Sequence, residues 1–129
     1  MTNDRQLITM NQFRFLEWGV YKDAKKVFTI VLGLVRRLPS EYRFELGNQV
    51  TRSALSIILN IAEGSGKSSD KELNRFLNTS LGSVHETIAA ADVLRDNKFI
   101  TERQFRELFV LLGGIANQLG GFKKKLKKS

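Results

Sequence analysis

The chain has 129 residues, of which 21 are basic and 13 acidic, and its formal net charge is +8 with a pI near 10.1. It contains no cysteine, so disulfide bonds and thiolate metal sites are excluded. The length suits one domain with a core of its own. Residues 1–12 hold no apolar signal-peptide core, and no stretch is apolar for long enough to span a bilayer. We therefore expect a soluble cytoplasmic protein with no membrane partner.

The excess positive charge is concentrated near the C-terminus. Five lysines lie between residues 123 and 128, and without them the chain has 16 basic and 13 acidic residues. A basic chain favours a polyanionic partner whose phosphates it neutralises. A soluble surface with a frayed lysine tail explains the charge equally well, so charge alone leaves both interpretations open.

The first predicted helix covers about residues 13–38. Apolar residues recur there at intervals of three and four, which is the period of an amphipathic helix. The helix should end before Pro39, the only proline of the chain, because proline disfavours the helical conformation of the residue that precedes it. The positions expected to face the core are Trp18, Tyr21, Ala24, Phe28, Val31, Val35 and Leu38.

The second predicted helix covers about residues 41–63. Ser40 is a suitable N-cap, since its hydroxyl can accept a hydrogen bond from a free backbone N–H of the first turn. Gly64 is expected to end the helix in the left-handed C-cap conformation, which glycine adopts without steric cost. The expected core positions are Leu46, Val50, Ala54, Ile57, Ile58 and Ile61.

Two capping boxes predict the starts of the third and fourth helices. Ser69 is followed three residues later by Glu72, and Thr101 is followed by Gln104. Four glycines should weaken the fourth helix or let another backbone approach it; they are Gly113, Gly114, Gly120 and Gly121. The core positions expected in these two helices are Leu73, Phe76, Leu77, Leu81, Val84, Ile88, Ala91, Leu94, Phe105, Leu108, Phe109, Leu112, Ile115, Leu119, Phe122 and Leu126.

Three short connections join these four helices, so each helix should run antiparallel to the one before it. We predict an all-α, antiparallel up-and-down four-helix bundle that forms a single domain over residues 1–129. Residues 1–12 would be an N-terminal extension and residues 123–129 a basic tail, and either segment could be disordered.

No group of residues predicts catalysis, a cofactor or a metal ion. His85 is the only histidine, and one imidazole without cysteine completes neither a catalytic triad nor a ligand set. Residues 66–68 resemble the end of a phosphate-binding P-loop, but Ile61 stands where that motif needs its first glycine, and the context is helix–turn–helix. We therefore expect a protein that is not an enzyme.

Several apolar residues fall outside the predicted core stripes. Phe15, Phe44 and Phe99 suit contacts in an oligomer, which we favour, or platforms on which unpaired bases stack. A helix of a bundle buries one stripe, and further apolar surface usually meets a partner. The remaining apolar residues that indicate an oligomer are Leu16, Val20, Leu34 and Leu55.

Two strings in the central third carry a family resemblance. Residues 60–64 read Asn-Ile-Ala-Glu-Gly and residues 82–86 read Gly-Ser-Val-His-Glu, and weaker marks lie at Trp18 and in residues 22–24. Over about residues 13–122 the chain resembles the small four-helix-bundle family of 23S ribosomal RNA intervening-sequence proteins. This family is related to the accessory variability proteins of retroelements.

The resemblance implies a left-handed bundle that assembles as a homo-oligomer, most commonly a pentamer. Family members are encoded within intervening sequences of large-subunit ribosomal RNA genes. It therefore implies a non-catalytic, basic RNA-binding protein associated with ribosomal RNA, as a ribosomal protein is. The alternative is a protein-interaction adaptor, such as an accessory subunit of a retroelement reverse transcriptase.

Two sets of site residues follow. Phosphate contacts are expected from Lys22, Lys25, Lys26, Arg36, Arg37, Lys123, Lys124, Lys125, Lys127 and Lys128. The other set is polar and lies in or near the family strings: Arg52, Asn60, Glu63 and Glu86. Counting outward from a turn at Gly66 places Arg52 opposite Gly82 and Ser83, within reach of Glu86. This set suits an RNA- or partner-binding surface, or a structural network that fixes helix register, which we favour.

Overall fold

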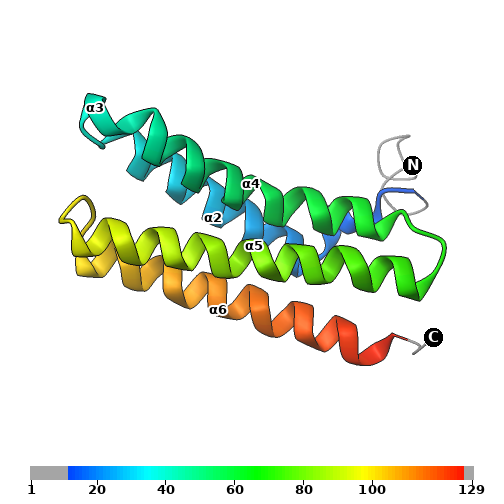
Figure 1. The fold of residues 1–129 in the computed structure, drawn as a ribbon. Coiled ribbons are helices and arrows are strands. Elements are labelled where there is room, and N and C mark those ends of the chain that lie inside the picture. Colours follow the sequence, from blue (N-terminus) through cyan, green and yellow to red (C-terminus); the bar gives the residue numbers. More distant parts are fainter. Residues whose placement is uncertain (1–11, 127–129) are drawn as a thin grey trace, which may run out of the picture.

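The structure is a computed structural model that describes residues 12–126, and these residues form helices and no strand (Figure 1). A short 3₁₀ helix, η1, covers Arg14–Glu17. The four long helices are α2 (Gly19–Arg36), α4 (Glu45–Ser65), α5 (Asp70–Asp96) and α6 (Glu102–Lys125), and the single turn α3 (Ser40–Arg43) joins α2 to α4. The predicted all-α bundle is confirmed.

The long helices pack in a closed ring of neighbours. The most extensive interface joins α4 and α5, while α2 contacts α4 and α6, and α6 also contacts α5. Hydrogen bonds join Ser53 to Thr87 and Ser56 to Ser83, so residues later in α4 meet residues earlier in α5, and the two helices are antiparallel. The left-handed twist expected from the family stays a prediction.

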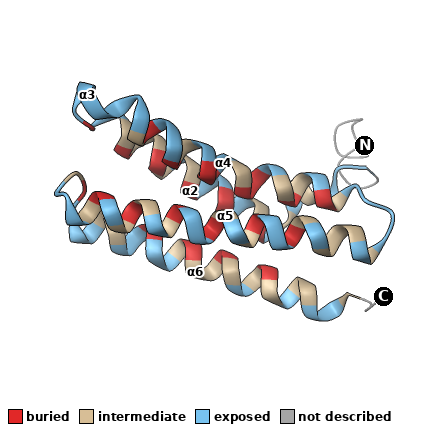
Figure 2. Ribbon diagram, viewed as in Figure 1, coloured by how far each residue is buried: buried red, intermediate tan, exposed pale blue. Residues whose placement is uncertain are grey.

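The core is built from residues that alternate three- and four-residue steps along each long helix, as in coiled coils. Figure 2 shows these buried positions on the inner sides of the helices. The stripes predicted for α4, α5 and α6 are largely confirmed, although Phe109 is 55% exposed. The principal buried apolar residues are Val20, Ala24, Val27, Val31, Leu34, Leu38, Val50, Ala54, Ile57, Ile58, Ile61, Leu77, Val84, Ala91, Leu94, Leu108, Leu112, Ile115 and Leu119.

The stripe predicted for the first helix is shifted. Val20 and Leu34, assigned to an oligomer contact, are only 2% and 8% exposed, whereas Tyr21 and Val35 are half-buried. This helix is apolar over a broad face because it contacts both α4 and α6, and spacing alone does not identify the centre of such a face. Two of the four residues that indicated an oligomer therefore belong to the monomer core.

The helix starts follow the predicted capping residues in the second half of the chain. Thr101 and Gln104 form the complete reciprocal capping box. Ser69 accepts a hydrogen bond from the backbone N–H of Glu72, but the Glu72 carboxylate pairs with Arg75 instead of returning to Ser69. Ser40 is not an N-cap; it is the first residue of α3, and no side-chain bond caps that turn.

Gly64 does not end its helix in a left-handed conformation. It lies inside α4, and no glycine in residues 12–126 has a positive φ. A Cβ atom at this position would lie 2.9 Å from Cβ of Phe76 and 3.1 Å from Cδ1 of Leu73. Glycine is needed here because α5 approaches α4 closely just after the turn that joins them.

Replacing Gly64 with alanine should therefore destabilise the bundle by about 1–2 kcal/mol, because the forced movement of Phe76 outweighs alanine's better helix propensity. Gly82→Ala is the matched control, since a Cβ there meets nothing within 4 Å, and it should stabilise the protein by about 0.5–1 kcal/mol. Urea unfolding of both variants measures the difference. A Gly64→Ala protein as stable as Gly82→Ala would contradict the close approach.

Candidate nucleic-acid interface

Charge is divided between two pairs of helices. The neighbours α2 and α6 contain nine basic and three acidic residues, whereas the neighbours α4 and α5 contain four basic and seven acidic residues. One side of the bundle is thus strongly basic and the other mildly acidic. Three of the nine basic residues are Lys123, Lys124 and Lys125, and without them the α2–α6 pair still has six basic and three acidic residues.

The basic side chains of α2 point to solvent. Lys22, Lys25 and Lys26 are exposed, and the ion pairs that Lys22 and Lys26 form are long. Nζ of Lys22 lies 3.4 Å from Glu17 Oε2, and Nζ of Lys26 lies 3.9 Å from Asp23 Oδ1. Exposed ion pairs of this kind contribute little to stability, so an anionic ligand can replace them at small cost.

A shallow groove of about 740 Å³, wide open to solvent, lies between α2 and α6. Ile30 and Leu111 supply its apolar surface, and Glu107 is its only acidic lining residue. The three lysines of α2 and Thr29 complete the lining. The α6 residues of this groove were not predicted as site residues, because the sequence does not show which helices are neighbours.

Contacts between the two helices place the described tail lysines beside the start of α2. The Trp18 and Phe122 rings are 5.0 Å apart, and Gln118 Nε2 donates to Asp23 Oδ2 at 2.9 Å. Helix α6 continues through these lysines, which are therefore not a disordered tail up to Lys125. Lys22, Lys25 and Lys26 lie in the first half of α2, and Lys123, Lys124 and Lys125 lie in the last turn of α6, so both groups occur toward the same end of the bundle.

The other predicted phosphate contacts lie apart from this cluster. Arg36 and Arg37 are exposed at the far end of α2, which is about 27 Å long at 1.5 Å per residue, and neither pairs with an acidic residue among those described. Arg103 and Arg106, exposed in the first turns of α6, belong to the same end and were not predicted. Lys127 and Lys128 lie outside the described residues.

The predicted polar set is not brought together. Arg52 and Glu86 are both exposed, and the expected link between them is not formed: neither has an ion pair within residues 12–126. The register is the reason, because Ser56, one turn after Arg52, is the residue that lies opposite Ser83. Gly82 is also exposed, and a Cβ atom added there would meet nothing within 4 Å.

Asn60 alone of that set belongs to a network. Its amide donates to the backbone oxygen of Ser56 at 2.8 Å and to the hydroxyl of Ser56 at 3.0 Å. Glu63 is exposed and lies 3.9 Å from Lys67 of the following turn. The network itself consists of serine and threonine hydroxyls between α4 and α5, namely Ser53, Ser56, Ser80, Ser83 and Thr87.

The remaining candidates have local partners. His85 is exposed and its Nδ1 lies 2.9 Å from the backbone oxygen of Leu81, one turn earlier. Lys67 of the P-loop-like string lies over the ring of Phe76. Within residues 12–126 no three acidic or histidine side chains gather as a metal site would require. None of the helices in that range has the length and apolarity needed to cross a membrane.

The model of the 23S rRNA-intervening sequence protein family matches residues 17–121, from the end of η1 almost to the end of α6. The chain belongs to this family. The match includes the lysines of α2 and the groove but ends before the lysines at the end of α6.

Membership of the 23S rRNA-intervening sequence family agrees with the fold of a solved structure. This neighbour, a protein of unknown function from the S23 ribosomal protein family of Bacteroides thetaiotaomicron VPI-5482, superposes with a TM-score of 0.76 and 23% identity. The superposition covers 82% of this chain and 99% of the neighbour. At that identity the likeness shows the fold alone. No curated protein matches the chain.

The lysines of α2 should be dispensable for folding. Replacing Lys22, Lys25 and Lys26 together with glutamine should change the free energy of unfolding by no more than about 0.5 kcal/mol, since all three are exposed and weakly paired. Thermal and urea unfolding followed by circular dichroism measure this. A loss above about 2 kcal/mol would show that these residues serve the fold and not a ligand.

Proposed function

We propose that this member of the 23S rRNA-intervening sequence family is a non-catalytic cytoplasmic protein that binds ribosomal RNA with the side formed by α2 and α6. The observation that carries the proposal is the division of charge, nine basic and three acidic residues on this helix pair against four and seven on the other. The family description supports ribosomal RNA as the polyanion.

The electrostatics favour binding in one orientation. Each phosphate neutralised by a lysine or arginine releases counterions, and this release drives association at low salt. Seven acidic residues on α4 and α5 would meet the same phosphates unfavourably. A polyanion therefore approaches the basic side, where exposed lysines and arginines occur at both ends of α2.

We further propose that the protein is a homo-oligomer, with the pentamer implied by the family resemblance as the expected form. Large apolar side chains remain exposed on three helices, among them Leu59 at 55%, Val93 at 53% and Val110 at 71%. A second copy could cover such residues. An oligomer would also repeat the basic side, and several weak phosphate contacts made together give avidity.

The oligomer can be tested by multi-angle light scattering at micromolar concentration. The expected mass is five times the 14.7 kDa of one chain. A mass of a single chain across the concentration range would contradict the oligomer while leaving RNA binding to be judged separately.

Binding to a structured ribosomal RNA fragment should weaken steeply as salt rises. Two variants remove two charges each: Lys25→Gln with Lys26→Gln on α2, and Lys71→Gln with Arg75→Gln on α5. Only the α2 pair should lower affinity and flatten the salt dependence, by up to about 0.7 in log–log slope per lost contact for single-stranded RNA. Affinities measured across a salt series test this.

A third variant replaces the five lysines of residues 123–128 with glutamine. It should also lower both affinity and slope, since three of them follow Phe122 in α6, whose ring contacts Trp18 at the start of α2. Equal effects of the α2 and α5 pairs would refute the proposed side. Absence of salt-dependent binding by the parent would refute RNA binding, and capture of a reverse transcriptase would then favour the adaptor function.

A further inference from the structure

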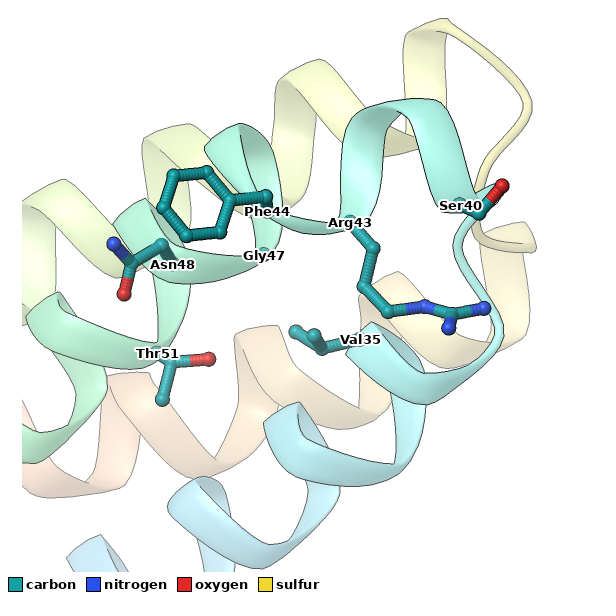
Figure 3. Close-up of a pocket in the computed structure, with 7 residues that line it drawn as sticks. All are labelled: Val35, Ser40, Arg43, Phe44, Gly47, Asn48 and Thr51. Carbon is teal, nitrogen blue, oxygen red and sulfur yellow. The ribbon is translucent and has the colours of Figure 1, made fainter.

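A second concavity lies at the end of the bundle where α2, α3 and α4 meet. It is wide open to solvent and has a volume of about 440 Å³. Figure 3 shows Phe44 and Asn48 along one edge, Arg43 across the opening and Val35 between them. The lining residues are Val35, Ser40, Arg43, Phe44, Gly47, Asn48 and Thr51.

Phe44 is the most exposed large apolar side chain in the described part of the chain, at 79%. The other aromatic residues outside the predicted stripes have partners, since Phe15 packs edge-on against Tyr21 at 5.0 Å and Phe99 lies 5.3 Å from Tyr42. Within residues 12–126, Phe44 alone among the aromatics has no ring partner, no cation over its ring and no contact with the core.

The Phe44 backbone is nevertheless held in place. It has helical dihedral angles, and its carbonyl accepts the backbone N–H of Asn48 at 3.1 Å. The ring is therefore displayed from an ordered turn. An aromatic ring held in water at this exposure is suited to stacking on a flat partner.

Polar groups without partners gather around the same concavity. The Ser40 and Thr51 hydroxyls and the Asn48 amide make no side-chain hydrogen bond to any described residue. In residues 12–126 every other serine and threonine hydroxyl except that of Ser68 makes one. A ligand here would meet both donors and acceptors at its edge.

The floor and the rim are shaped by two further residues. A Cβ atom on Gly47 would lie 2.6 Å from Cγ1 of Val35, so only glycine lets α4 come this close to α2. Nη2 of Arg43 donates to the backbone oxygen of Leu38 at 3.0 Å, which holds the guanidinium at the rim with other N–H groups free. Two further basic residues, Arg36 and Arg37, immediately follow Val35 in the sequence. Two acidic residues, Glu41 and Glu45, are also close to the concavity in the sequence.

We propose that this concavity receives an unpaired base of the bound RNA, which would stack on Phe44. The base edge would meet the Asn48 amide and the Thr51 hydroxyl, which lie on the same side of the concavity as Phe44, and the neighbouring phosphate would meet Arg43 (Figure 3). A flat π surface with polar edges, joined to a negative charge, matches this set of side chains better than an aliphatic group does. The inference rests on the proposed RNA binding, and it adds that the protein recognises unpaired bases in single-stranded segments of the RNA.

The test compares a short fluorescent single-stranded RNA with the same strand in a duplex, using the full chain and anisotropy. Phe44→Leu keeps an apolar side chain but removes the ring, and it should weaken single-strand binding at least about fivefold, the lower end of base–aromatic stacking. Phe44→Trp should retain binding. Duplex affinity and the salt slope should not change, because paired bases are unavailable and no charge is lost.

Phe13→Leu, which removes another exposed ring at a position just before η1, is the matched control and should bind as the parent does. Phe44 is too exposed for its replacement to unfold the bundle, and circular dichroism verifies this. Parent-like single-strand binding by Phe44→Leu overturns the base pocket but leaves the proposed function intact; a docking site for a protein side chain would then be the better reading. A parent that binds neither RNA refutes both proposals.

Discussion

The close packing of α4 against α5 through small hydroxyl side chains is the constraint on which the bundle depends. Ser53, Ser80 and Thr87 are at most 2% exposed. The Thr87 hydroxyl donates to Ser53 at 2.9 Å, and the Ser80 hydroxyl donates to the backbone oxygen of Ile57 at 2.9 Å. Such bonds form at one register only, because a shift would leave a buried hydroxyl without a partner at a cost of about 1–3 kcal/mol.

The same packing explains the glycine of the Asn-Ile-Ala-Glu-Gly string. Gly64 lets the first turn of α5 approach α4, and the hydroxyl pairs continue the contact along both helices. No buried side-chain nitrogen or oxygen in the described residues lacks a hydrogen-bond partner. The buried polar side chains between these two helices thus all have hydrogen-bond partners, and family motif residues contribute to this interface.

The division of charge follows this arrangement of helices. The α4–α5 pair contains most of the acidic residues, and α2 and α6 pack beside it with their polar sides outward. The basic residues gather on one side although they are far apart in sequence, because contacts such as Trp18–Phe122 bring the start of α2 to the end of α6. The groove between these helices combines lysines with the apolar Ile30 and Leu111, a surface suited to both phosphates and less polar ligand groups.

Features set by neighbouring residues could be predicted from the sequence. Thr101 and Ser69 start helices because capping depends on a few consecutive residues, and the core stripe of α4 follows from its period. The exposed lysines of α2 were predicted for the same local reason. The prediction placed Phe44 outside the core correctly but did not reveal the concavity beside it.

Features that depend on helix pairing could not be predicted. The register of α4 and α5 differs by about one helical turn from the count based on Gly66, and the Arg52–Glu86 link failed for that reason. The role of Gly64 depends on where Phe76 lies, and the role of Val20 depends on which two helices flank α2. The spacing of residues within one helix specifies neither the position of Phe76 nor the helices that flank α2.

The central claim, that RNA binds the side formed by α2 and α6, is tested most directly by mapping contacts on the protein. Ultraviolet crosslinking of the full chain to a ribosomal RNA fragment, followed by mass spectrometry of the crosslinked peptides, locates the bound surface without any substitution. Crosslinks should fall in residues 19–51 and 102–126, with Phe44 among them if a base stacks there. Crosslinks confined to residues 52–96 would place the RNA on the acidic helix pair and contradict the account.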